Sequence, residues 1–309
     1  MKRRGRTILV GALAVSLLLA VQFASPAPGG VWLRTLYDSL HVPVFGVVAI
    51  CILYLTPAKW GGIKRVLATT VAVLALGALS ELAQIPTDRD ASVNDLIADW
   101  LGAAGFVCIA LGFARNVSIP RGRRLLLALL GIAFITPPLL PLAKVSAAYV
   151  VRAQSLPALI RFDSPFARVF VRLQNAKLIP QSSAGPASAS VNIQLGDGPW
   201  PGIVFSDLWP NWASYDDLVI AIENPGADTL PVNLRVHDRE HRREQRFRDR
   251  FNRTIELAEG LHVIRIRLSE IQDAPDGRQM NLSEIDGLVI FATRQEAGRQ
   301  FVLHEIRLE

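Results

Sequence analysis

Five long runs without a charged residue in the first half of the chain constrain its fold more than any other feature. A helix that crosses a bilayer needs about 20 mostly apolar residues, and these runs reach that length when their polar ends lie at an interface. Because lipid offers no hydrogen-bond partner to backbone groups, such runs must be helical. The predicted spans are residues 8–25, 39–57, 66–84, 95–114 and 125–144.

Basic residues between these spans predict their orientation. The first and third loops carry one each, Arg34 and Arg89, whereas the N-terminus and the second and fourth loops carry eleven. These eleven are Lys2, Arg3, Arg4, Arg6, Lys59, Lys64, Arg65, Arg115, Arg121, Arg123 and Arg124. Because basic loops stay in the cytoplasm, we expect a cytoplasmic N-terminus and an extracytoplasmic second half. A signal peptide cleaved near Ser25 is an alternative for the first span, and it leaves the second half outside as well.

Charge divides the chain at the same place. Residues 1–150 carry a net charge of +8 and residues 151–309 a net charge of −2. The basic excess therefore belongs to the apolar half, where it indicates membrane topology rather than nucleic-acid binding. The two cysteines, Cys51 and Cys108, lie in apolar runs and predict neither a disulfide framework nor a metal site.

From about Leu156 the apolar residues alternate with polar ones, which is typical of half-buried antiparallel strands. The predicted strands are 158–163, 168–173, 190–195, 202–206, 217–223, 232–237, 252–257, 262–268, 287–292 and 300–308, with a loop at 182–190. Short strands separated by turn residues predict a sandwich or jelly roll. The predicted fold class is a membrane α-helical bundle of five transmembrane helices over residues 1–150, followed by an extracytoplasmic all-β sandwich or jelly-roll domain over 156–309. Pro137, Pro138 and Pro141 predict a break in the outer half of the fifth span.

Polar and ionisable side chains of the second to fourth spans gather at one predicted depth, near the outer interface. They are Asp38, His41, Glu81, Gln84, Arg89, Asp95 and Asp99. Glu81 and Gln84 are three residues apart, and Asp95 and Asp99 are four apart, so each pair shares a helix face. An ionisable group inside a membrane is a candidate functional residue because it is expensive to bury.

These residues resemble the VanZ-like family of small bacterial membrane proteins over about residues 35–115. The shared pattern is Asp-x-x-His at one helix start, then Glu-x-x-Gln, an Arg, and an Asp-Leu-Ile-x-Asp-x-x-Gly segment. The chain departs from the family at Ser39 and Leu40, where a Lys is common, and at Asp99, where Asn is usual. The resemblance implies a bacterial inner (plasma) membrane location, and the namesake of the family is linked to reduced susceptibility to a glycopeptide antibiotic.

Four roles for this cluster stay open at the level of the sequence. His41 and Arg89 could bind the phosphate of a lipid or lipid-linked glycan headgroup, while Gln84 and the carboxylates bind its sugar. Glu81 or Asp95 could act as a general base beside His41. The same three residues could ligate a metal. Finally, the carboxylates could pair with His41 and Arg89 and lock the helices together.

Aromatic residues cluster before one predicted strand of the second half. Trp209, Trp212 and Tyr215, together with Asp238 and the segment around Arg250, resemble carbohydrate-binding jelly rolls of the galactose-binding-like type. The resemblance implies that these five residues bind sugar, since aromatic faces stack on sugar rings. The same aromatic side chains could instead fill the core of the sandwich.

Eight arginines between Arg235 and Arg253 alternate with acidic residues. This mixture predicts a solvated, salt-bridged segment, with contact to an anionic glycan or lipid as the alternative. The sequence contains no glycine-rich phosphate loop, nucleophile elbow or His-Glu-x-x-His motif.

We therefore predict an integral membrane protein without catalytic residues that recognises a cell-envelope glycan or a lipid-linked headgroup, with a role in envelope integrity or glycopeptide antibiotic susceptibility. The expected partners are membrane lipid or lipid-linked glycan and a cell-wall or surface polysaccharide, and we expect no cofactor, metal or nucleic acid. One alternative is a membrane enzyme that acts on a lipid-linked headgroup with Glu81 and His41 as an acid–base pair. A second is a structural assembly scaffold.

Overall fold

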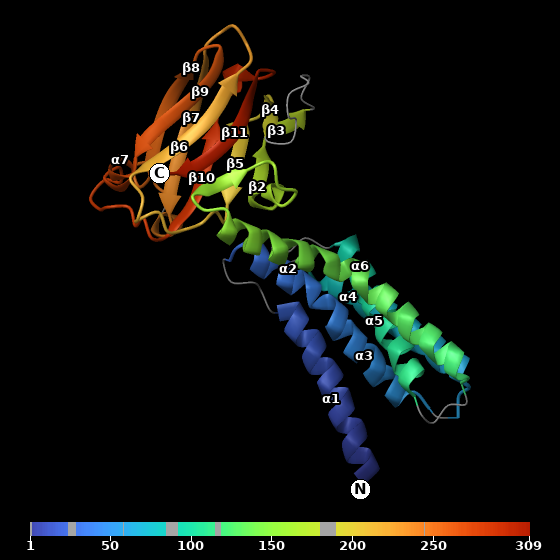
Figure 1. Cartoon of the computed structure of the whole chain (residues 1–309). Helices are drawn as coiled ribbons and strands as arrows, with labels where there is room; N and C mark the ends of the chain where they lie inside the picture. Colours follow the sequence, from blue (N-terminus) through green and yellow to red (C-terminus); the bar gives the residue numbers. More distant parts are fainter. Residues whose placement is uncertain are drawn as a thin grey trace. The chain divides into compact units, whose positions relative to one another are not determined.

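The computed structural model of the chain describes residues 2–23, 29–57, 59–84, 92–114, 119–179, 190–243 and 245–309. The chain forms two compact units, Met1–Lys144 and Val145–Glu309, which are helical and mostly β-stranded respectively (Figure 1). Arg89 and the predicted loop at 182–189 lie outside the described residues.

The helices of the first unit overlap the predicted spans, but the second stretch begins at Val31 and not at residue 39. They are α1 (Lys2–Phe23), α2 (Val31–Ser39), α3 (His41–Leu55), α4 (Gly62–Gln84), α5 (Val93–Phe113) and α6 (Arg121–Gln154). Leu40 keeps helical φ and ψ angles of −67° and −20°, so α2 and α3 form one helical stretch. Within the described residues, five helical stretches are long and apolar enough to cross a membrane.

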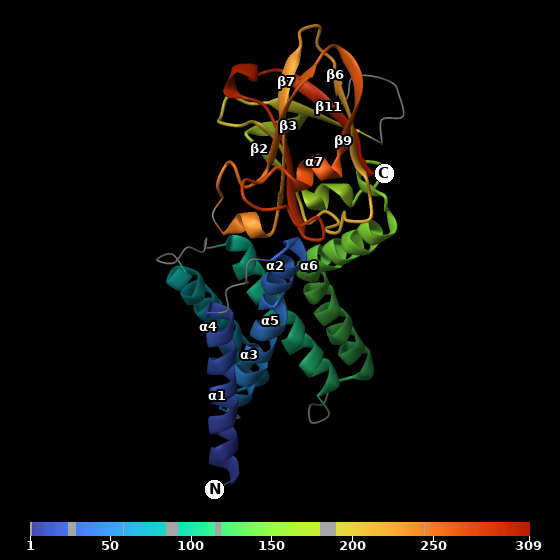
Figure 2. The ribbon, with the colours of Figure 1, turned by 90° about the vertical axis from the view of Figure 1, so that its left-hand side faces the viewer.

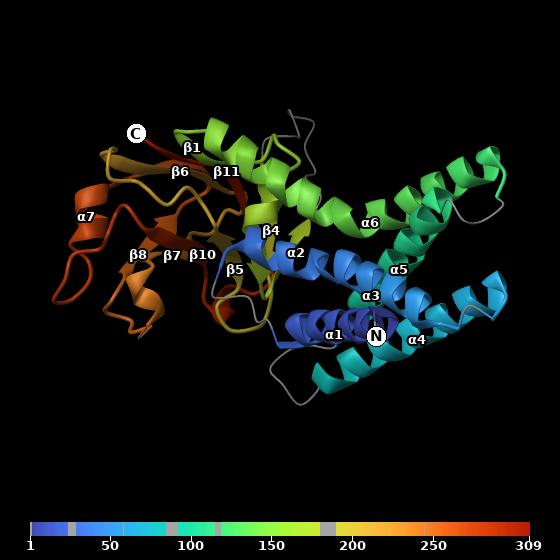
Figure 3. The same cartoon turned by 90° about the horizontal axis from the view of Figure 1, so that it is seen from below.

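Glycines bring α3 and α5 into close contact. A Cβ atom at Gly102 of α5 would lie 2.4 Å from the carbonyl oxygen of Val42, and one at Gly46 of α3 would lie 2.4 Å from the ring of Phe106. Small residues permit this approach of two helix backbones. Helix α3 also contacts α1 and α4, and the three run side by side in Figure 3.

The predicted break in the fifth span is wrong, because α6 continues from Arg121 to Gln154 with Pro137, Pro138 and Pro141 inside it. Each proline removes one backbone hydrogen bond, whereas unwinding the helix would leave more N–H and C=O groups without partners. The helix also extends ten residues beyond the predicted end of the span. Its last turns, from Val145, belong to the second unit.

The second unit is an antiparallel β-sandwich, which confirms the predicted all-β architecture (Figure 2). One sheet has the strand order β3-β4-β11-β6-β9, with β1 paired to β11, and the other has the order β2-β5-β10-β7-β8. The strands are β1 (Ala158–Arg161), β2 (Val171–Gln174), β3 (Ala176–Ile179), β4 (Val191–Leu195), β5 (Gly202–Ser206), β6 (Asp217–Asn224), β7 (Leu230–Asp238), β8 (Phe251–Leu257), β9 (Gly260–Arg267), β10 (Ile285–Phe291) and β11 (Gln300–Leu308). The sequence predicted neither β3 nor the short helix α7 (Leu268–Gln272), which follows β9.

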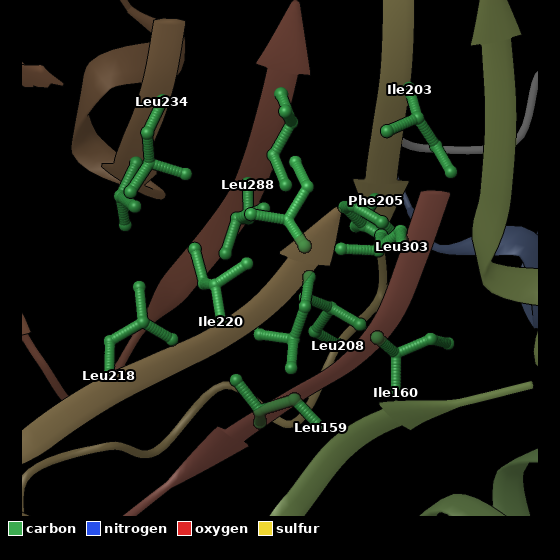
Figure 4. Close-up of a cluster of buried hydrophobic side chains, with 14 of the residues drawn as sticks. Leu159, Ile160, Ile203, Phe205, Leu208, Leu218, Ile220, Leu234, Leu288 and Leu303 are labelled. Atoms are coloured by element: carbon green, nitrogen blue, oxygen red, sulfur yellow. The ribbon is translucent and has the colours of Figure 1, made fainter. Parts of the chain in front are cut away.

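Alternating apolar residues of both sheets form the core between them. Ile203, Phe205 and Leu288 of one sheet and Ile220 and Leu303 of the other are almost fully buried and meet in one cluster (Figure 4). Period-two alternation places every other residue of a strand in this core. The remaining residues of each strand therefore form the two outer faces of the sandwich.

Replacement of Gly102 tests the close packing of α3 and α5. Gly102→Ala should lower the apparent unfolding temperature of the detergent-solubilised chain by several degrees, because the added methyl group meets the Val42 backbone, and overpacking costs about 1–3 kcal/mol. Gly11→Ala in α1 is the matched control, since nothing lies within 4 Å of its added Cβ. An unchanged unfolding temperature for Gly102→Ala would contradict this packing.

Candidate functional site

The outer face of the sheet β2-β5-β10-β7-β8 carries a groove of about 550 Å³, which we call the sheet groove. Its lining residues are Arg172, Gln174, Trp200, Val204, Phe205, Ser206, Arg235, His237, Arg242, Phe247, Arg250, Asp286, Gly287, Val289 and Phe291. Adjacent strands lie ~4.8 Å apart, so a row across the five strands is roughly 19 Å long.

Strand register assembles the floor of the sheet groove. One row of paired residues crosses all five strands in the order Arg172, Val204, Val289, Arg235 and Asn252. Directly paired residues of antiparallel strands share one face. The neighbours of these residues on β2, β5, β10 and β7 pack into the core, so the members of the row on those strands face outward.

A second row beside the first contributes an aromatic side chain. Gln174, Gly202 and Phe291 are consecutive partners across β2, β5 and β10. The ring of Trp200 packs edge-on against Phe291, with 5.7 Å between the ring centroids.

Two exposed aromatic residues stand at the rim of the sheet groove. Trp200 is 56% exposed and Phe247 is 67% exposed. Trp200 has a φ angle of +54°, a backbone conformation that is rare for a bulky residue and is often found where function requires it. Neighbouring side chains hold this turn: Gln174 donates to the carbonyl of Trp200 at 3.1 Å, and Asn175 donates to that of Pro199 at 2.6 Å.

Arginine side chains give the sheet groove a positive charge. Arg242 donates to both oxygens of Asp286, including a 2.6 Å bond from Nη2 to Oδ1. Arg172, Arg235 and Arg250 have no carboxylate within ion-pair distance among the described residues. The Nε of Arg250 donates to Asn252 at 3.1 Å, and its guanidinium lies 5.2 Å from the centre of the Phe247 ring.

Burial perturbs two groups in the floor of the groove. The Nε atom of Arg235 and the Nδ1 atom of His237 are buried and have no hydrogen-bond partner in the described part of the chain. Burial and the nearby Arg250 lower the pKa of Arg235 to about 10, so it stays charged. Burial, Arg235, His241 and Arg250 lower the pKa of His237 to about 3, so its ring is neutral near pH 7.

A second charged cluster lies next to the groove, where Arg278 joins its own loop to the end of β7 and to the loop that contains Asp249. Arg278 donates to Asp238 Oδ2 at 2.6 Å and Oδ1 at 2.9 Å, and to Asp249 Oδ1 at 2.6 Å. Asp238 is fully buried and also accepts from the backbone N–H groups of Asn281 and His241. Burial raises the pKa of Asp238, but these hydrogen bonds outweigh burial and lower the pKa overall.

Of the five sugar-binding candidates, Arg250 alone lines the sheet groove. Trp212 is fully buried, and its Nε1 donates to the Trp209 carbonyl at 2.7 Å. Trp209 and Tyr215 are half-buried and pack against the core. Asp238 binds Arg278 and the loop backbone, so it stabilises the loops beside the groove.

In the helical unit, the structure brings His41 and Asp99 together. His41 Nδ1 lies 2.8 Å from Asp99 Oδ1, and both side chains are almost fully buried. Gly77 of α4 makes room for the pair, since a Cβ atom there would lie 3.1 Å from Asp99 Oδ2. This contact joins α3 to α5 within the interior, as the packing alternative requires.

Glu81 connects the end of α4 to the start of α5. Its Oε2 accepts from the backbone N–H of Ser92 at 2.6 Å, and Ser92 in turn caps α5 by accepting from the N–H of Asp95. Both Glu81 and Asp95 lie close enough to His41 to act on it electrostatically. Asp38, by contrast, is exposed.

The side chains of Gln84 and Arg89 are not among those described. No group of three His, Cys, Asp or Glu side chains that could hold a metal occurs in the described ranges. The headgroup site that the sequence predicted at this level stays a prediction.

Most residues of the sheet groove were not predicted from the sequence. The alternation over 232–237 placed Asn233, Arg235 and His237 on one polar face, and this signal could have identified the basic floor. Nothing in the sequence pairs these residues with Arg172 or Phe291, because only the order of the strands makes them neighbours.

Comparisons with known proteins find solved structures that are similar to part of this chain. No family model matches the sequence, and no curated protein matches it, so the resemblance to the VanZ-like family stays a prediction. An exo-β-agarase matches 49% of this chain with 24% of its own, at 15% identity and a TM-score of 0.39. A family 11 carbohydrate-binding module from Clostridium thermocellum, in complex with a β-1,3-1,4-mixed-linked tetrasaccharide, matches 45% of this chain with 82% of its own, at 13% identity and a TM-score of 0.33. The chain spans about a quarter of the length of the agarase, and a likeness of this extent concerns the fold of the sandwich and not its ligand.

Removal of the buried charge of Asp238 tests whether this residue stabilises the sandwich. Asp238→Asn should lower the unfolding temperature of the sandwich by roughly 5–10 °C, corresponding to about 2–4 kcal/mol, because Arg278 loses its buried partner. Asp276→Asn is the control, since its ion pair with Arg248 is exposed at both ends and should contribute less than about 1 kcal/mol. Because the pKa of Asp238 is lowered, its contribution is present above about pH 4 and is lost as the pH falls further. Equal effects of the two substitutions in thermal unfolding at pH 7 would contradict this assignment.

Proposed function

We propose that this protein binds a glycan in the sheet groove and does so as a binding protein, without a catalytic step. The observation that carries the proposal is the groove itself, a concave sheet face with exposed aromatic rings at its rim and unpaired polar groups in its floor. Concave sites that combine aromatic faces with a few placed polar groups are typical of small-molecule and oligosaccharide ligands.

In this proposal, aromatic residues stack on the sugar rings and polar residues form hydrogen bonds to the hydroxyl groups. The rings of Trp200 and Phe247 offer flat apolar faces to the C–H groups of sugar rings. Gln174, Arg235 and Arg250 offer hydrogen-bond donors to hydroxyl groups. The solved carbohydrate-binding modules share the sandwich fold, and the tetrasaccharide bound to one of them is consistent with a glycan ligand here.

The helical unit serves as the membrane anchor in this proposal. Five apolar stretches of sufficient length and the basic residues of alternate loops support five crossings with the sandwich outside the cell. A sandwich in that compartment would meet cell-envelope or surface polysaccharide. Roles in envelope integrity and in glycopeptide antibiotic susceptibility belong to the same proposal, as does binding of a lipid-linked headgroup by the helical cluster.

Substitution of the rim tryptophan tests the glycan site. We expect the detergent-solubilised chain to be retarded in native gels that contain at least one polysaccharide from a panel of mixed-linkage β-glucan, agarose, polygalacturonate and peptidoglycan fragments. Trp200→Ala should weaken this binding about tenfold, because a stacking surface is lost. Leu261→Ala removes an equally exposed apolar side chain from β9 and should leave binding unchanged. If none of the polysaccharides in the panel retards the chain, the proposal is contradicted.

Labelling of single cysteines tests the proposed topology. In a Cys51→Ala/Cys108→Ala background, Ser283→Cys should react with a membrane-impermeant maleimide on intact cells, because it lies exposed in the sandwich. Gly61→Cys, exposed in the second loop, should react after the cells are permeabilised. The reverse pattern would place the sandwich in the cytoplasm and contradict an envelope glycan as its ligand.

A further inference from the structure

We infer that the ligand of the sheet groove is an acidic glycan, whose carboxylate or sulfate groups bind between Arg172, Arg235 and Arg250. This inference rests on the proposed glycan site and adds the chemical class of the sugar. It depends on which arginines of the sandwich have an acidic partner and which do not.

Eight arginines elsewhere in the sandwich have acidic partners, whereas Arg168, Arg243, Arg267 and Arg294 have none within the described ranges and are exposed to solvent. Arg265 lies 2.9 Å from Asp217, and Arg307 lies 2.9 Å from Glu305. Arg299 lies 2.6 Å from Glu296. Further pairs hold Arg161, Arg239, Arg248, Arg253 and Arg278.

The sheet groove differs because it gathers several arginines without acidic partners at one site. Its single acidic lining residue, Asp286, is bound by Arg242 through two hydrogen bonds. Three further guanidinium groups line the same groove and have no carboxylate partner within the described ranges. Lining residues therefore leave an excess of three positive charges at one site, and charge of one sign concentrated in a groove favours a ligand of the opposite sign.

Arg235 is the residue that most needs a partner. It lies in the floor, half-buried between Val289 of β10 and Asn252 of β8. Its Nε atom is buried without an acceptor among the described residues, and the neighbouring Arg250 repels it. An anion bound by the two guanidinium groups in the groove would relieve this repulsion.

Guanidinium groups favour bidentate acceptors, such as planar carboxylate or tetrahedral sulfate, that offer two oxygen atoms to two parallel N–H groups. The histidine of the floor adds no charge near pH 7, so the positive potential comes from arginines alone. The aromatic rim distinguishes a glycan from a small free anion, since Trp200 and Phe247 provide surface for sugar rings that an inorganic ion cannot use.

The test compares matched polysaccharides that differ in charge. Affinity electrophoresis of the detergent-solubilised full chain is run against polygalacturonate and its fully methyl-esterified form, and against ι-carrageenan and agarose. We expect at least tenfold tighter binding to the acidic member of one or both pairs. Preference for polygalacturonate would identify a carboxylate as the bound group, and preference for ι-carrageenan would identify a sulfate. The affinity should fall as salt is raised from 50 to 500 mM.

Variants assign the charge selectivity to the floor. Arg235→Gln and Arg172→Gln should each reduce binding of the acidic polysaccharide at least fivefold, while Arg235→Lys recovers part of the loss. Arg265→Gln, which removes a paired arginine from β9, is the matched control and should have no effect. Arg172 is exposed, so Arg172→Gln remains informative if Arg235→Gln does not fold.

Two outcomes would overturn the inference. Equal or tighter binding to the neutral members would show a neutral-glycan site, and the proposed function would survive. Tighter binding to a single-stranded oligonucleotide or to vesicles with 30% anionic lipid, lost in the same arginine variants, would assign the groove to another class of anion. Absence of binding of the wild-type chain to every polysaccharide would instead remove the proposed function itself.

Discussion

The register between β7 and β10 is the constraint on which the outer face of the sandwich depends. Leu234 and Val236 of β7 enter the core, and this places Arg235 and His237 on the opposite face. A shift of one residue would bury a guanidinium and expose two apolar side chains, so the register is strongly specified. The same alternation in β2 and β10 then completes a continuous floor across the sheet.

The polar clusters of the chain differ in whether their charged groups have partners of opposite charge. This difference separates clusters that stabilise packing from a cluster that can bind a ligand. His41 and Asp99 bind each other through Asp99 Oδ1 inside the helical unit, while Asp99 Oδ2 is buried without a partner among the described residues, and the glycines of α3 and α5 let the helices pack closely. Arg278 is likewise satisfied by Asp238 and Asp249. Three of the four arginines that line the sheet groove have no acidic partner among the described residues, and this uncompensated charge supports a ligand there.

A membrane anchor and an extracellular sandwich, if the proposed topology holds, would keep the groove close to the cell surface. Tethering raises the effective concentration of a site for ligands held on the same surface, so a modest intrinsic affinity can suffice. An arginine-rich floor suits this setting because its charge does not change over the physiological pH range. The rim aromatics then add contact area that depends on sugar shape rather than on charge.

The amino-acid sequence by itself determined the helical stretches, the strand alternation and the division near residue 150, because hydrophobic periodicity is a local property. Of its sugar-binding candidates, Arg250 lines the sheet groove, whereas Trp212 fills the core, which was the alternative for the aromatic residues. Only the tertiary structure decided which polar residues meet, since strand order joins Arg172 to Arg235 through β5 and β10. Pairing between distant segments depends on how the two sheets share one core, and no single segment carries that information.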